Sequence, residues 1–455
     1  MIIFLILFLS LNLFSQEKNF SHSDYFENYE GTKTCLDCHQ KEAESFFYSQ
    51  HYQWKGLAPD LVNHKGEKLG KINIMNDFCT NPKGCWLGIF KSQKGVTIAK
   101  GCGVCHPGFG EIPEEKISQK QLENIDCLIC HASGYRRDVY EEDGKFKIKP
   151  ILWKNQEGLN SVSKRITLPK RDMCLRCHAG SGGGMNWKRG DIEPTLSNTS
   201  REYDVHIGSG MECIDCHKGK DHRILGRGAD IVSSDRVGDK LQCESCHGKK
   251  MHPIDILNKH LERVACVTCH IPSFAREYET DMFRNWSKLE QNEENGKYEP
   301  EIEFAKNVKP VYKWWNGKTI TSSILGEPVL LKDGKVQIMV PDGSKEDPKS
   351  KIFPFKYHKA IIPLEEGTNM LLPVKCVEAF SSGDIMKAIN LGSEEYYKRK
   401  PKGVKWVESE RYMGIFHSIP PKEKALDCFD CHGKKGSFDF KALGYTKDPI
   451  KRIIE

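Results

Sequence analysis

A Cys-x-x-Cys-His pattern recurs eight times in this chain of 455 residues, and we number the copies motifs 1 to 8 in chain order. The cysteine pairs are Cys35/Cys38, Cys102/Cys105, Cys127/Cys130, Cys174/Cys177, Cys213/Cys216, Cys243/Cys246, Cys266/Cys269 and Cys428/Cys431. The histidines that complete them are His39, His106, His131, His178, His217, His247, His270 and His432. Two thiols at this spacing can bond the two vinyl groups of one porphyrin, and the adjacent imidazole can bind its iron. The pattern predicts eight covalently attached haem c groups.

Zinc is the alternative partner for such cysteine pairs, since a structural zinc site uses four Cys or His ligands. Zinc does not require a histidine directly after every second cysteine, and all eight copies have one. A thioredoxin-like redox motif would explain one copy, not eight. Because the motifs use sixteen of the nineteen cysteines, a disulfide framework is not expected either.

Residues 1–15 form an apolar run that ends in small and polar residues, which is typical of a cleaved signal peptide. The run from Ile2 to Phe14 is too short to span a bilayer comfortably. We therefore expect a periplasmic or otherwise exported protein, in agreement with covalent haem attachment.

The formal charge of +6 at pH 7 does not indicate a nucleic-acid partner. Ionised propionates would bring a holoprotein with eight oxidised haems to about −2. We expect no nucleic acid among its partners.

The motifs are spread unevenly, and this predicts the layout of the chain. Residues 16–274 hold seven motifs, residues 275–425 hold none, and residues 426–455 hold motif 8 and a tail. We expect a mainly α, loop-rich multihaem fold with little regular structure and a helix over residues 44–54. In residues 275–425 we expect a small insertion with some strands, because β-branched runs there are broken by turn signals at Asn316–Gly317 and Asp333–Gly334.

Nine histidines lie outside the motifs and are candidates for the second axial position of each iron. His22 and His64 stand in polar, loop-like sequence, and we take them as spares. The seven predicted distal ligands are His51, His206, His222, His252, His260, His358 and His417. Seven ligands for eight irons leave one iron without a second histidine, which is where a substrate can bind.

Several segments beyond the motifs resemble the octahaem tetrathionate reductase family of periplasmic cytochromes and, more distantly, hydroxylamine oxidoreductase. They include NDFC, GGGMNWKRGD, YDVHIGSGMECIDCH and FHSIPPKEKALDCFDCHG. The resemblance implies a catalytic haem at motif 2, bound by His106 and by a lysine amine. It places that lysine at Lys188, with Lys154 and Lys170 as further candidates.

The resemblance also implies a free cysteine, Cys79, beside the catalytic haem, where a thiolate could act on sulfur substrates. A Cys79–Cys85 disulfide is the open alternative, and Cys376 is expected to be simply buried.

These features favour a periplasmic reductase of small sulfur or nitrogen compounds such as tetrathionate, nitrite or hydroxylamine. A periplasmic or membrane donor, such as a quinol-oxidising cytochrome, would supply electrons, and Lys188 and Arg189 would hold the anion. The alternative is an electron conduit with no substrate site. Oxidation of hydroxylamine ranks last, since no tyrosine matches the cross-linking residue of that enzyme.

Overall fold

The computed structural model describes residues 20–64, 68–78, 85–151, 158–226, 228, 234–236 and 238–450. The predicted signal peptide, Cys79 and Lys154 lie outside the described residues. Within the described ranges, no helix combines the length and the apolar character that a membrane span requires.

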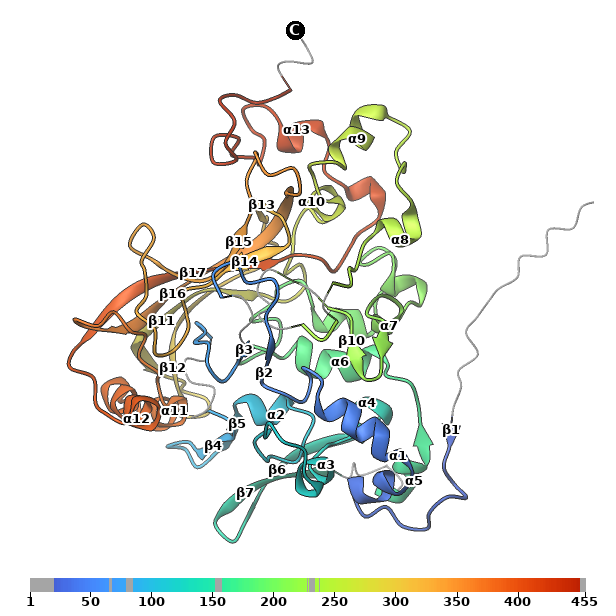
Figure 1. Ribbon diagram of the computed structural model, residues 1–455, viewed down its shortest axis with the longest axis vertical. Helices are drawn as coiled ribbons and strands as arrows, with labels where there is room; N and C mark the ends of the chain where they lie inside the picture. The colour runs from blue at the N-terminus through green and yellow to red at the C-terminus, as the bar shows by residue number, and fades with distance from the viewer. Residues whose placement is uncertain are drawn as a thin grey trace, which may run out of the picture.

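Most helices in the motif-bearing parts of the chain are a single turn, because the motif itself forms them. Cysteines three residues apart lie on the same face of one helical turn, which aims both thiols in one direction. Motif helices are α1 (Thr32–Phe47), α2 (Cys102–Cys105), α4 (Leu128–His131), α6 (Arg171–His178), α7 (Cys213–Cys216), α8 (Glu244–His247), α10 (Cys266–His270) and α13 (Cys428–Cys431). Figure 1 shows most of them rising along one side of the molecule, from α1 at the bottom to α13 at the top.

Short helices and two-stranded ribbons fill the spaces between these motif helices. The helices are α3 (Gln119–Glu123), α5 (Leu159–Lys164) and α9 (Asp255–His260). The paired strands are β1 (Phe20–Ser21) with β8 (Arg165–Ile166), β2 (Lys55–Leu57) with β3 (Lys68–Gly70), β4 (Gly88–Lys91) with β5 (Thr97–Lys100), β6 (Arg136–Glu142) with β7 (Lys145–Ile151), and β9 (Gly219–Lys220) with β10 (Arg223–Ile224).

The helix expected over residues 44–54 is only partly present. Helix α1 ends at Phe47, and turns follow as far as Tyr52. The turn buries the Tyr52 ring, whose hydroxyl donates hydrogen bonds to the main-chain and side-chain oxygens of Gln121. This tertiary contact overrides the local helical pattern.

A seven-stranded mixed sheet dominates the haem-poor region. Its strands are β11 (Thr280–Gln291), β12 (Tyr298–Ala305), β13 (Val311–Trp315), β14 (Lys318–Ile320), β15 (Val336–Asp342), β16 (Lys351–Glu365) and β17 (Val404–Gly414). The order is β12-β11-β16-β17-β15-β14, with β13 also on β16. The β11/β16 and β15/β17 pairs are parallel, and the others are antiparallel. Helices α11 (Cys376–Ser382) and α12 (Ile385–Tyr397) lie near one end of the sheet (Figure 1).

The prediction of a mainly α fold with a small β insertion is therefore wrong, because the protein is a mixed α/β structure. Strand β16 runs for fifteen residues and is rich in aromatic and β-branched side chains, which suit a buried sheet. The two predicted turns are confirmed: Asn316–Gly317 joins β13 to β14, and Asp333–Gly334 has the positive φ angles of a tight hairpin turn.

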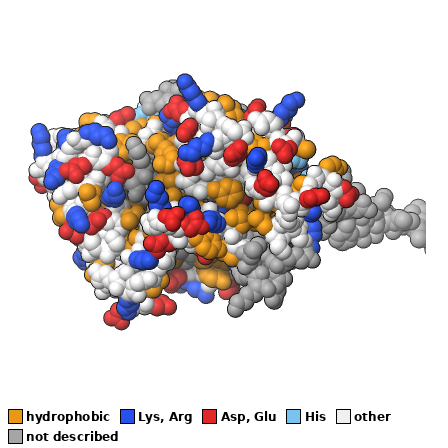
Figure 2. Space-filling view, turned by 90° about the horizontal axis from the view of Figure 1, so that it is seen from below, with side chains coloured by type: hydrophobic (Ala, Val, Ile, Leu, Met, Phe, Trp, Pro, Cys, Tyr) orange, Lys and Arg blue, Asp and Glu red, His pale blue; other side chains and the backbone are white. Residues whose placement is uncertain are grey.

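The largest hydrophobic core joins this sheet to the N-terminal part of the chain. Trp286, Ile338 and Ile362 of the sheet pack with Leu69 and Met75. Cys376 belongs to the same core and is buried, as predicted. On the face seen in Figure 2, acidic and basic side chains are interspersed among hydrophobic ones.

Candidate functional site

Seven of the eight motif histidines face a histidine from elsewhere in the chain. The ring centres of each pair lie 5.9–6.3 Å apart. The pairs are His39 with His22, His131 with His222, His178 with His51, His217 with His417, His247 with His206, His270 with His252, and His432 with His260.

This spacing fits haem. Two imidazoles bound to opposite sides of one iron, at about 2 Å each, have ring centres about 6 Å apart. Direct packing of two rings has no reason to give the same distance seven times. The residues present therefore suit seven haems with two histidine ligands each.

Hydrogen bonds to the Nδ1 atoms orient several of these rings, as acceptors around ligating histidines commonly do. His131 donates to the Thr167 carbonyl at 3.0 Å, and His217 donates to the Leu225 carbonyl at 2.7 Å. A ring held in this way keeps Nε2 unprotonated and turned away from the acceptor.

Two histidines, His22 and His358, have surroundings that differ from their predicted roles. His22, taken as a spare, lies opposite His39, and its Nδ1 is buried without a hydrogen-bond partner in the described structure. His358, predicted as a ligand, is fully buried between two carboxylates. Its Nδ1 lies 2.6 Å from Asp77 Oδ2 and its Nε2 lies 3.0 Å from Asp281 Oδ1. With both ring nitrogens engaged, His358 has none left for iron.

His106 is the motif histidine without a histidine partner, although all seventeen histidines lie in the described ranges. Its ring instead contacts Tyr52 and Trp86, with centroid distances of 4.9 and 4.8 Å. Its Nε2–H donates to the Tyr52 carbonyl at 2.7 Å, so binding of iron through Nε2 requires this hydrogen bond to break, whereas Nδ1 is buried with no hydrogen-bond partner among the described residues. Burial lowers the pKa of His106 to about 3, helped by the positive charge of Lys71, so the ring is in the neutral form that metals bind.

Arg137, on strand β6, holds the motif 2 segment in place. Its guanidinium donates hydrogen bonds to the carbonyls of Val104, His106 and Gly108, and it pairs with Asp126 at 3.3 Å. Both side chains of this ion pair are buried. Motif 2 is thus fixed by a charged side chain from outside its own helix.

Contacts between cysteines of different motifs order the haem sites into a line with one branch. Cys35 of motif 1 lies close to Cys127 of motif 3, Cys174 of motif 4 lies close to Cys213 of motif 5, and Cys243 of motif 6 lies close to Cys266 of motif 7. Cys130 also lies near Cys174, Cys216 lies near Cys246, and Cys431 of motif 8 lies near Cys269 of motif 7, which completes the line.

Motif 2 forms the branch. The Cys177 thiol of motif 4 donates to the Cys105 carbonyl at 3.4 Å. The order is therefore 1-3-4-5-6-7-8 with motif 2 joined to motif 4.

The glycine-rich loop after motif 4 carries Lys188 to the cavity that His106 lines. This cavity, of about 3440 Å³, is also lined by side chains of six other motifs. Gly182 has φ 89°, and a Cβ there would lie 2.8 Å from Lys188 Cβ and 3.2 Å from the Phe78 ring. The missing side chain lets the loop pack closely on Lys188 and Phe78.

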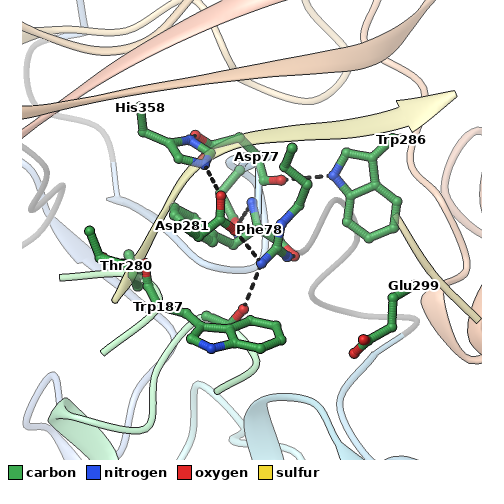
Figure 3. Close-up of polar contacts among 12 residues, drawn as sticks. Asp77, Phe78, Trp187, Thr280, Asp281, Trp286, Glu299 and His358 are labelled. Carbon is green, nitrogen blue, oxygen red and sulfur yellow. Dashed lines mark hydrogen bonds and ion pairs between the residues drawn. The ribbon is translucent and has the colours of Figure 1, made fainter. Parts of the chain in front are cut away.

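A buried charged cluster joins this loop to the sheet (Figure 3). Arg284 of β11 pairs with Asp281 and donates to the carbonyls of Phe78 and Gly182 at 2.8 and 3.0 Å. Asp77 pairs with Arg411 of β17 at 2.7 Å. The Phe78 ring stacks on His358 with centroids 4.4 Å apart. Strands β11, β16 and β17 of the haem-poor region thereby position the Asp77–Phe78 segment and the loop that contains Gly182.

Lys356 of β16 is a second anchor for the loop. Its Nζ donates to the carbonyls of Trp187 and Lys188 at 2.8 and 2.9 Å, and to Thr280 Oγ1 at 2.6 Å. Full burial lowers the pKa of Lys356 to about 7. No local sequence pattern marks this anchor, because two of its partners are main-chain carbonyls more than 160 residues away.

The remaining predicted residues are placed as follows. Lys188 and Arg189 line the cavity, and Arg189 also pairs with Asp191 at 3.3 Å. Lys170 precedes helix α6 and does not line the cavity itself, although its neighbours Pro169 and Arg171 do. Cys85 is buried. Lys71 lines the cavity close to His106 and was missed, since a single lysine outside any motif carries no sequence signal.

Comparisons with known proteins find similar cytochromes. Residues 281–435 match the family model "Cytochrome c bacterial", and residues 199–280 match "Cytochrome c7 and related cytochrome c". An uncharacterised protein of Archaeoglobus fulgidus is 32% identical over 263 residues, which cover 50% of this chain and 87% of that protein. The crystal structure of octahaem cytochrome c from Shewanella oneidensis is similar over 92% of this chain and 94% of that chain, with a TM-score of 0.76 and 28% identity.

Proposed function

Because the chain belongs to the octahaem cytochrome c family, we propose that it is an exported reductase that acts on a small sulfur or nitrogen compound at motif 2. It carries multiple covalently bound haem c groups, and the motif count supports eight. Bound haems supply electron storage and transfer and, at motif 2, an iron open to small molecules.

One observation carries the proposal: His106 alone among the motif histidines lacks a histidine partner. The two histidines outside the seven pairs, His64 and His358, do not serve as the partner of His106. His358 is bound by two carboxylates, and His64 lies 3.9 Å from Glu327. A pure conduit would need a strong ligand on every iron, so this arrangement favours a substrate site over the conduit alternative.

The chain's own residues suit an anionic substrate. Lys71 and Lys188 line the cavity, and their positive charges attract an oxyanion such as nitrite or tetrathionate. We propose Lys188 as the displaceable amine opposite His106, because Gly182 and Lys356 fix the loop that bears it. Nitrite, hydroxylamine and tetrathionate remain the candidate substrates, and a periplasmic or membrane cytochrome is the proposed donor.

The reductase proposal is tested by mixing the anaerobically reduced holoprotein with each candidate substrate and following haem absorbance. We expect at least one compound to reoxidise the protein rapidly, and we expect prior treatment with cyanide to abolish this reaction by blocking the open iron. Slow reoxidation by every compound, unchanged by cyanide, would contradict a substrate site.

We propose His22 as the axial partner of His39, and its exchange for alanine tests this assignment. The His22→Ala protein is expected to gain one high-spin haem in its electron paramagnetic resonance spectrum, because the iron at motif 1 loses a strong ligand. His64→Ala is the matched control and should leave the spectrum unchanged. An unchanged His22→Ala spectrum, together with a new high-spin signal in His358→Ala, would restore the original prediction.

A further inference from the structure

The acceptors around the axial histidines are of two chemical kinds. His131, His217 and His260 donate from Nδ1 to main-chain carbonyls. His417 and His432 donate instead to carboxylates: His417 Nδ1 lies 2.9 Å from Asp191 Oδ2, and His432 Nδ1 lies 2.6 Å from Asp448 Oδ1. A carboxylate acceptor makes an imidazole a more basic ligand than a carbonyl acceptor does.

Asp448 is held firmly against the His432 ring. Its Oδ2 accepts from the Gly433 amide at 2.6 Å, and its Oδ1 accepts from the Ile450 amide at 3.0 Å. The side chains of Asp448 and His432 are only 13% and 15% exposed, so water competes weakly for the bond. The Gly433 and Ile450 amides and the His432 ring surround the carboxylate with hydrogen-bond donors, which favours its ionised form.

The charge of Asp191 is partly compensated, whereas that of Asp448 is less so. Asp191 also pairs with Arg189 and accepts from the Phe416 amide at 2.9 Å. In the described part of the chain, the ion pair recorded for Asp448 is with His432. On the other side of the same site, His260 Nδ1 donates to the Ile256 carbonyl at 2.9 Å, so both axial rings of motif 8 are oriented.

We propose that Asp448 sets the redox potential of the motif 8 haem. The carboxylate strengthens His432 as an electron donor to iron, which stabilises the oxidised state and lowers the potential. Motif 8 ends the line of sites, so Asp448 adjusts the haem at one terminus of that line. The inference concerns a potential and holds whether or not motif 2 reduces a substrate.

The test is a spectroelectrochemical titration of the holoprotein in wild-type, Asp448→Asn and Asp439→Asn forms. Asparagine keeps the size of the side chain but removes its charge, so we expect one one-electron component of Asp448→Asn to move to higher potential. Asp439 lies on the same C-terminal segment, is exposed, and accepts from the Ala442 amide at 3.0 Å instead of from an axial histidine. The Asp439→Asn curve should superimpose on that of the wild type.

Two results would overturn the inference: an Asp448→Asn curve identical to wild type, or an equal shift in Asp439→Asn. Asp448→Glu provides a second test if the asparagine variant fails to incorporate haem. Its longer side chain displaces the carboxylate from Nδ1 without changing net charge, so we expect an upward shift of the same component. A wild-type curve for Asp448→Glu would count against the direct hydrogen bond.

Discussion

Exchange of Asp77 for asparagine is expected to lower the free energy of unfolding by about 3–5 kcal/mol, the cost of breaking a buried ion pair from one side. Asp77 is fully buried and contacts both Arg411 and His358, which are themselves almost fully buried. Although burial alone would raise the pKa of Asp77, the charges of Arg411 and His358 hold it well below its ordinary value. Removal of the carboxylate therefore leaves a buried guanidinium without its counter-ion.

Chemical denaturation followed by circular dichroism, at equal haem content, measures this effect. Asp333→Asn is the control, because Asp333 is exposed in a turn and its exchange should change stability by less than about 0.5 kcal/mol. The stabilisation by Asp77 is present above its unfolded-state pKa of about 4 and is lost as the pH falls through the lower folded-state value. Equal stabilities of wild type and Asp77→Asn would show that the cluster is not needed to hold the fold.

Exchange of Lys188 for alanine is expected to reduce substrate turnover at least tenfold, in the range of losses seen when groups that support a metal site are removed. The variant loses both the proposed amine ligand and a positive charge in the cavity. Its resting spectrum should show one haem changed from low spin to high spin.

Two further variants separate these roles. Lys188→Arg keeps the positive charge, but guanidinium stays protonated and cannot bind iron, so it should show the same spectral change. Lys71→Ala tests the other amine that lies close to His106. A new high-spin haem in Lys71→Ala, with none in Lys188→Ala, would assign the ligand to Lys71.

The candidate site was predictable where its signal is local. The motif spacing identifies His106 and the other seven motif histidines without any structure. The choice between His22 and His358 depends on Asp77 and Asp281, each more than 70 residues from His358 in sequence. Because these contacts are long-range, sequence context could not show that both nitrogens of His358 are occupied.

The fold was predictable only in part, for a related reason. Turn signals at Asn316–Gly317 and Asp333–Gly334 are local and were correct. The pairing of β11 with β16, and of β15 with β17, is parallel and joins distant segments. Such pairings leave no local pattern in the sequence beyond separate β-rich runs. The sequence therefore predicted a small insertion with some strands, where the structure has a seven-stranded sheet.

The most direct test of the substrate site is a titration of the wild-type holoprotein, oxidised and reduced, with cyanide, nitrite, hydroxylamine, tetrathionate and sulfite. The number of haems that change spectrum is the quantity to measure, since a lysine-ligated iron can be low-spin at rest. We predict that one haem in eight responds and that the response is altered in Lys188→Ala. A protein in which no haem responds in either oxidation state would have every iron closed, which would contradict the substrate site at His106 and leave an electron conduit.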